Sequence, residues 1–244
     1  MQINTCRNCN ETVNWNYCPN CGQPAKLKRI DGRYLIQEIG DFFFANKGML
    51  YTIKRVLIRP GESVRQFITE DRYRFVKPIT FLFITSLIYT LVNYLFGIGA
   101  NDYTQQYDEL EGSTAGLIFK WMLIDYPGYS GIITGLFIAL WVKMFFRKSG
   151  YNLFEIFILL CFLTGITTLF ISVVAIIQGM THLKLLEFSS YFGMIYLFWA
   201  IGQFFDRKKW MSYMKAFLSF ILGTFTLGIL VGIIGTLIDS MIKN

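Results

Sequence analysis

The sequence has few charged residues. Asp, Glu, Lys and Arg make up 16% of its 244 positions, while hydrophobic residues reach 54% and aromatic residues 18%. This composition is typical of a protein in lipid rather than in water. Histidine is nearly absent, with His182 as the single example, and the sequence contains neither a glycine-rich phosphate loop nor a zinc-protease helix motif. Since no acid, base and nucleophile come together in the pattern, we expect a non-enzymatic protein.

Five apolar segments are long enough to cross a bilayer as helices, which takes about 20 mostly apolar residues. They are residues 79–99, 127–147, 153–178, 188–205 and 215–238. We therefore predict an all-α polytopic membrane protein with five transmembrane helices. Its predicted parts are a head (1–26), a basic amphipathic juxtamembrane belt (27–78) and a five-helix transmembrane domain (79–244).

Lysine and arginine are distributed unevenly between the two sides of this predicted bundle. With the amino terminus inside, 20 of the 23 cations and 9 of the 16 acids fall on the inner side. Cytoplasmic loops hold an excess of Lys and Arg, so this bias predicts a cytoplasmic amino terminus and an external carboxyl terminus. No cleavable secretion signal is visible ahead of the first apolar segment. The short inner loops contribute Arg147, Lys148, Lys209 and Lys215, among others.

Four of the five cysteines lie in the first 21 residues. Cys6 and Cys9 form one Cys-x-x-Cys pair, and after eight residues Cys18 and Cys21 form another. This spacing lets four thiolates converge tetrahedrally on one Zn²⁺ ion, and in the reducing cytoplasm it favours a metal over disulfides. No histidine or carboxylate leaves a coordination position open, so we predict a structural zinc ribbon whose metal supplies folding energy. The fifth cysteine, Cys161, stands alone in an apolar segment.

The predicted ribbon does not reveal its partner. Arg7 and Lys26 are basic, but Trp15 and Tyr17 are the only aromatic residues nearby, so nucleic-acid binding is disfavoured. A protein partner is the expectation that remains for the head.

The belt concentrates positive charge directly before the first apolar segment, with twelve cations in residues 26–77. Apolar residues recur there at helical spacing, around Leu35 and Ile39, then in 50–57, then in 64–68. Basic amphipathic helices of this kind lie in the headgroup plane, so the belt is predicted to contact anionic lipid. A sharper hypothesis remains open, in which four guanidinium groups form a pocket for a phosphate-bearing lipid or nucleotide. They belong to Arg59, Arg65, Arg72 and Arg74.

The head and belt also carry a family resemblance. The strings are CPNCGQ, Thr52, Leu57-Ile-Arg-Pro-Gly61, Arg65, Phe67-Ile68, Arg72-Tyr73 and Pro78. Over about the first 95 residues they resemble a bacterial membrane family catalogued as domain of unknown function 3667. The resemblance implies a multi-span protein of the bacterial cytoplasmic membrane with a zinc-ribbon head. It implies no activity.

Within the apolar segments, small residues recur every four positions, as Gly131 and Gly135 in one segment and Gly228 and Gly232 in another. Such faces let helices approach closely, either inside the protein or in a homo-oligomer. The acidic segment 101–116 between the first two spans is interpreted as a solvated external loop. Glu155, at the inner start of the third span, is expected to form a structural tether to Arg147 or Lys148.

Together these patterns predict an adaptor, assembly or regulatory protein of the bacterial inner membrane. Its zinc-held head would recognise a protein partner while the belt contacts anionic lipid. The alternative is a transporter, channel or scramblase-like protein for a small or lipidic solute, with the belt arginines collecting anionic headgroups.

Overall fold

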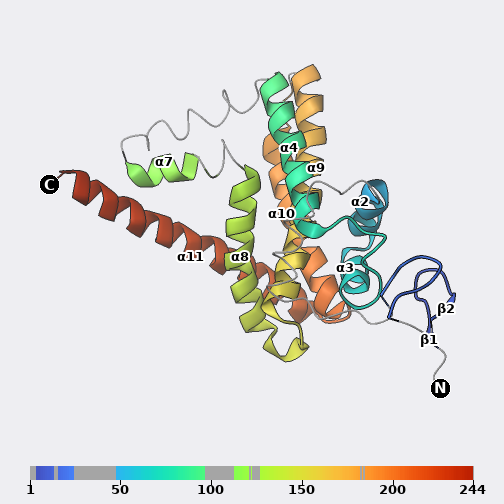
Figure 1. Cartoon of the computed structure of the whole chain (residues 1–244). Coiled ribbons are helices and arrows are strands. Elements are labelled where there is room, and N and C mark those ends of the chain that lie inside the picture. Colours follow the sequence, from blue (N-terminus) through green and yellow to red (C-terminus); the bar gives the residue numbers. More distant parts are fainter. Residues whose placement is uncertain are drawn as a thin grey trace.

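The computed structural model describes residues 4–13, 16–24, 48–96, 113–120, 122, 127–181, 183 and 185–243. In this part the chain is helical apart from a small two-stranded antiparallel sheet near the amino terminus (Figure 1). Three predictions fall outside the described residues. They concern the amphipathic stretch around Leu35 and Ile39, the acidic loop over residues 101–112, and His182.

A long helix occupies each of the five apolar segments. They are α4 (Pro78–Phe96), α8 (Pro127–Phe145), α9 (Leu153–Thr181), α10 (Leu186–Asp206) and α11 (Trp210–Lys243). Among the described residues, three helices are long and apolar enough to cross a membrane, namely α4, α9 and the Trp210–Met241 part of α11. These helices support an all-helical membrane protein. That α8 and α10 also cross the membrane stays a prediction.

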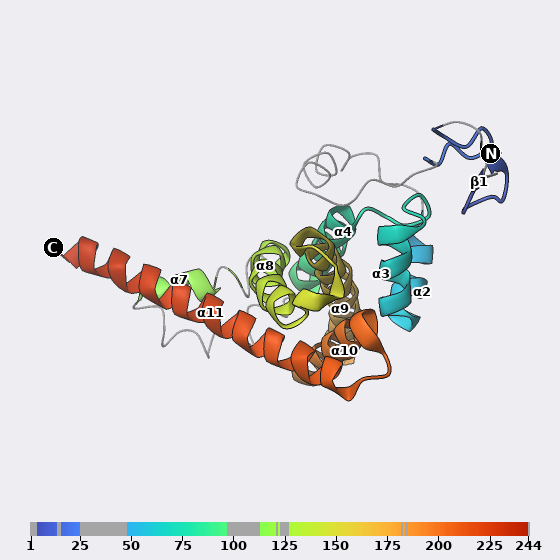
Figure 2. The same ribbon diagram turned by 90° about the horizontal axis from the view of Figure 1, so that it is seen from below.

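Helix α9 lies at the centre of the bundle, in contact with α4, α8 and α10 (Figure 2). Of its most apolar 18-residue window, 61% is buried inside the protein, against 22% for α11. Helix α11 packs on α10 and α8, and its far end extends beyond them to contact α7 (Thr114–Lys120) (Figure 1). An apolar helix that is covered by protein on most sides is a core helix, whereas the exposed apolar side chains of α11 suit lipid.

The start of α9 is determined by a reciprocal cap. The Glu155 backbone N–H donates to Asn152 Oδ1 at 2.8 Å, and the Asn152 backbone N–H donates to the Glu155 carboxylate at 2.7 Å. Each side chain thereby satisfies a backbone donor that a helix start leaves unpaired. Glu155, expected to tether a basic residue, therefore acts as part of this capping pair.

Two short helices, α2 (Met49–Ile58) and α3 (Pro60–Thr69), precede the first long helix and pack on α9, and α3 also contacts α10. Val64 and Phe67 have no exposed surface, and the Phe67 ring meets Phe162 of α9 edge to face at 5.2 Å. The apolar face expected from the spacing of Val64, Phe67 and Ile68 is thus present, but protein covers it. The basic side of α3 is not covered in this way, and its contact with lipid headgroups stays a prediction.

The glycines predicted to line helix contacts behave differently in the two helices. A Cβ at Gly131 would lie 3.1 Å from Thr164 Cγ2, and one at Gly135 would lie 3.9 Å from Leu160 Cβ, so both glycines lie at the α8–α9 contact. Around Gly228 and Gly232, no described atom lies within 4 Å of such a Cβ. These two glycines make no internal helix contact in the described part of the chain, so the homo-oligomer alternative stays open for them.

A different face of α11, which carries Gly223 and Gly235, packs against α8 and α7. A Cβ at Gly223 would lie 2.7 Å from Ile138 Cα, and one at Gly235 would lie 2.5 Å from Ala115 Cβ. These glycines allow α8 and α7 to approach the backbone of α11. Gly223 and Gly235 are not part of the every-four series of small residues on this helix, so that series did not identify the α11 face that packs in the described part of the chain.

Candidate metal centre

The cysteine head, here residues 4–13 and 16–24, consists of two turns with the same hydrogen bonds. In the first, the Cys6 N–H donates to Glu11 O at 2.7 Å and the Asn10 N–H donates to Cys6 O at 2.9 Å. In the second, the Cys18 N–H donates to Gln23 O at 2.7 Å and the Gly22 N–H donates to Cys18 O at 2.9 Å. The strands β1 (Asn4–Thr5) and β2 (Thr12–Val13) flank the first turn.

A left-handed residue follows the second cysteine of each pair. Asn10 has φ of 60° and Gly22 has φ of 72°. Asparagine and glycine are the residues that adopt this conformation most readily, and it turns the chain so that both sulfurs of a pair face the same point. This matching pair of turn residues strengthens the case for two equivalent knuckles.

The four cysteine sulfurs converge. Those of Cys6, Cys9, Cys18 and Cys21 all lie within 4.8 Å of one another. The Cys6–Cys21 and Cys9–Cys18 pairs are each separated by 3.5 Å. Four sulfurs at about 2.3 Å from a central zinc ion would lie about 3.8 Å apart, so the observed spacing fits a tetrahedral thiolate site.

The charge state of these thiols also fits a cation site. Backbone N–H groups of Cys9 and Asn8 point at the Cys6 sulfur and lower the pKa of this thiol to about 7. The Glu11 N–H lowers the pKa of the Cys9 thiol, but burial and the neighbouring sulfurs outweigh it and raise this pKa to about 12. Four adjacent thiolates repel one another unless a cation lies between them. Soft sulfur ligands in this geometry can hold a metal ion, and zinc is the ion we expect.

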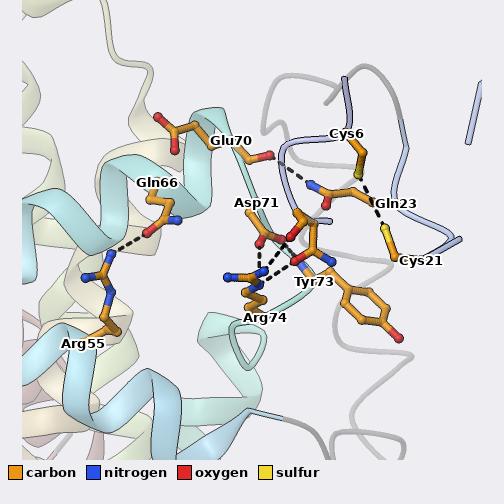
Figure 3. Close-up of polar contacts among 10 residues, drawn as sticks. Cys6, Cys21, Gln23, Arg55, Gln66, Glu70, Asp71, Tyr73 and Arg74 are labelled. Carbon is orange, nitrogen blue, oxygen red and sulfur yellow. Dashed lines mark hydrogen bonds and ion pairs between the residues drawn. The ribbon is translucent and has the colours of Figure 1, made fainter. Parts of the chain in front are cut away.

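The head is attached to the end of α3 (Figure 3). The Arg7 guanidinium donates to Thr69 O at 2.8 Å, and the Gln23 side-chain amide donates to Glu70 O at 3.1 Å. The last carbonyl groups of a helix have no partner within the helix, and a cation is favourable at this negative end of its dipole. The cysteine head therefore supplies part of the C-terminal cap of α3.

A buried carboxylate strengthens this attachment. Asp71 is 2% exposed, accepts the Tyr73 backbone N–H at 2.9 Å and forms an ion pair with Arg74 at 3.4 Å (Figure 3). The Arg74 guanidinium also donates to the side-chain oxygen of Asn8 and to its backbone O, the latter at 2.6 Å. Asp71 thus orients Arg74, and Arg74 holds the loop between Cys6 and Cys9.

The variant Arg74→Gln should loosen the head without removing its metal, because glutamine cannot bridge Asp71 and Asn8 together. We expect faster amide hydrogen exchange across residues 4–24 with an unchanged metal content. Arg59→Gln is the matched control, since Arg59 is exposed and pairs only with Glu62, at 3.5 Å, among the contacts described. Equal exchange in both variants would contradict the assigned role of Arg74.

The four belt arginines have separate partners in the structure. Arg72 donates to Phe67 O at 3.3 Å and to Ile68 O at 3.1 Å, which completes the cap of α3. Arg65 donates to two carbonyl groups near the end of α10, Gln203 O at 2.9 Å and Phe204 O at 2.6 Å. Arg59 pairs with Glu62, and Arg74 holds the head, as described above. Much of this positive charge therefore caps helix ends, and a phosphate pocket made by these four residues stays an untested hypothesis.

The contact between α3 and α10 is unusually close. A Cβ at Gly61 would lie 2.6 Å from Gln203 C and 2.7 Å from Phe204 N, so only glycine fits. Elsewhere on α10, the Tyr196 hydroxyl donates to Val56 O of α2 at 2.7 Å. Pro60, the first residue of α3, is itself a helix-start signal in the sequence.

The comparisons with known proteins give one match. Residues 46–90 match the family described as "Protein of unknown function (DUF3667)", which confirms the resemblance seen in the sequence. The matched segment contains α2, α3 and the start of α4, and the cysteine head lies outside it. No curated protein and no solved structure matches the chain.

Proposed function

We propose that the protein is a non-enzymatic adaptor, assembly or regulatory component of a bacterial inner membrane. In this proposal a structural zinc ion holds the cysteine head on the cytoplasmic side, the five long helices all cross the membrane, and the carboxyl terminus is external. The basic side of the belt lies against anionic headgroups.

The observation that carries the proposal is an unbroken series of contacts from the head to the long helices. The head caps α3 through Arg7 and Gln23. Helix α3 is then joined to α10 by Arg65 and by the close approach at Gly61. A partner that binds the head would therefore act directly on the arrangement of the long helices.

The sequence segment with the family match supports the same reading. It covers α2, α3 and the start of α4, which together form the structural link between head and bundle. In this link, polar side chains bind backbone carbonyl groups of the protein itself, as expected of a segment that joins two parts of a structure. The described residues of the link bring together no acid, base and nucleophile.

The test is capture of partners from native membranes with the full-length chain and its Cys6→Ser/Cys18→Ser variant. We expect at least one protein to be enriched with the wild type and lost with the variant, because the variant head cannot hold its metal. Retention of the same partners by both proteins would contradict the adaptor role of the head. Movement of lipid or solute in proteoliposomes, undiminished by the double substitution, would instead support the transporter or scramblase-like alternative.

A further inference from the structure

A pocket of about 480 Å³ opens where α8 ends and α11 begins. Its walls come from the short 3₁₀ turn η4 (Arg147–Ser149), the end of α10 and the first two turns of α11. This volume lies within the usual range for small-ligand sites. The pocket is distinct from the metal centre and from the belt arginines.

Positive charge in this pocket exceeds negative charge. Four cations line it, namely Arg147, Lys148, Lys209 and Lys215, together with one carboxylate, Asp206. Asp206 already pairs with Lys209 at 3.0 Å. Arg147 and Lys148 are exposed, and neither forms an ion pair within the described residues. Their donors therefore remain available for an anion, unlike those of Arg65 and Arg72, which bind backbone carbonyl groups.

The floor of the pocket is aromatic. Phe146 stacks on Phe205 with ring centres 3.9 Å apart and planes inclined by 10°. Lys215 Nζ lies 5.6 Å from the centre of the Phe146 ring, so a cation–π contact holds this ammonium group at the edge of the floor. A cationic rim above an apolar floor suits an anion that carries an organic group.

The start of α11 adds to the positive potential. This helix begins at Trp210, and its first turn contributes Met211 and Ser212 to the wall. The Ser212 N–H already donates to Lys209 O at 3.0 Å, so the contribution of this helix start is the positive end of the helix dipole. Helix starts of this kind favour phosphate groups when side-chain cations stand beside them, as they do here.

We propose that this pocket binds a phosphate-bearing anion, with Arg147 and Lys148 as the principal phosphate contacts and the Phe146–Phe205 pair beneath the organic part. The pocket lies where apolar helices end and charged turns begin, and in the proposed arrangement, with α8 and α10 crossing the membrane, this is the depth of lipid headgroups. The phosphate can therefore belong to a phospholipid of the adjacent leaflet or to a soluble phosphate ester.

The experiment compares the full-length protein in neutral detergent with two double variants. Arg147→Gln/Lys148→Gln removes two pocket cations. Arg207→Gln/Lys208→Gln removes the same charge from exposed residues that directly follow α10 and do not line the pocket. The lipid arm titrates phosphatidylglycerol against phosphatidylcholine and counts bound lipid by native mass spectrometry. The soluble arm titrates glycerol 3-phosphate by calorimetry.

We expect the pocket variant to bind its phosphate probe about 30-fold more weakly, because each cation near an anionic group contributes about a factor of five. The control variant should bind as the wild type does. Binding of phosphatidylglycerol alone identifies a lipid headgroup, and binding of glycerol 3-phosphate identifies a soluble ester. Equal weakening of binding in both double variants would overturn the proposal. So would a wild-type protein that neither prefers phosphatidylglycerol to phosphatidylcholine nor binds glycerol 3-phosphate. If the pocket variant fails to fold, the single variant Lys148→Gln provides the same comparison at one exposed pocket cation.

Discussion

The Cys18→Ser protein is expected to contain no bound metal, whereas the wild-type chain should contain one ion per cysteine head. A serine hydroxyl does not replace a thiolate ligand, and the four sulfurs within 4.8 Å of one another form a closed site with no spare donor among the described residues. Binding of a structural zinc ion supplies on the order of 10 kcal/mol to a small domain. Loss of the ion should therefore unfold the head.

Two measurements check this prediction. Elemental analysis of the purified protein gives the metal and its stoichiometry, and hydrogen exchange over residues 4–24 reports the folding of the head. Cys161→Ala is the matched control, because Cys161 is buried in α9 and belongs to no cluster of described metal-ligating residues. Full metal content in the Cys18→Ser protein would show that the four-cysteine cluster is not the binding site. A metal other than zinc would change the cofactor but leave the site intact.

The second large effect is expected from Gly61→Ala. The added Cβ would lie 2.6 Å from the backbone of Gln203, a distance that real Cβ contacts do not reach, so α3 and α10 must separate. Overpacking of this kind costs about 1–3 kcal/mol. The shift would also pull Arg65 away from the carbonyl groups of Gln203 and Phe204. We expect a Tm several degrees below that of the wild type.

Gly193→Ala is the matched control for this prediction. It makes the same chemical change inside helix α10, but its Cβ would lie 3.6 Å from the nearest described atom, Thr167 Cβ, which is an ordinary contact. Alanine favours a helix over glycine, by about 1 kcal/mol in a helix interior such as position 193, so a lower Tm for Gly61→Ala must come from the steric effect. A thermal unfolding curve for each protein in the same detergent measures it. Similar Tm values for both would show that the α3–α10 contact does not constrain the fold.

If Gly61→Ala separates α3 from α10, the link from head to bundle should weaken as well. The Cys18→Ser variant breaks the same series of contacts at its other end. Partner capture that fails in both variants would support transmission along this series, because the two substitutions are in different elements and share no direct contact.

The long helices could be located from the sequence because each contains a predominantly apolar run of about 20 residues. The cysteine cluster could also be predicted, since ligand type and spacing along the chain are enough to bring four thiols together at a candidate metal site. The spacing of Val64, Phe67 and Ile68 likewise predicted a helix with one apolar face. What the same spacing could not show is whether lipid or protein covers that face, because both are apolar and select the same residues.

The role of the belt cations illustrates a second limit. Charge placement along the chain predicts which side of the membrane a segment occupies, and that reasoning treats all arginines alike. The structure separates Arg65 and Arg72, which bind carbonyl groups at helix ends, from Arg147 and Lys148, which remain available. From the sequence, the latter pair was predicted to contribute to the topology signal and to pair with Glu155.

The amino-acid sequence by itself determined the membrane class, the position of the long helices and the four-cysteine cluster, because these depend on local composition and on spacing within about twenty residues. Only the tertiary structure decided that the head caps α3, that Gly61 permits α3 to meet α10, and that two short turns combine into a basic pocket. Each of these joins residues far apart in the chain, and such contacts depend on how the helices pack in three dimensions.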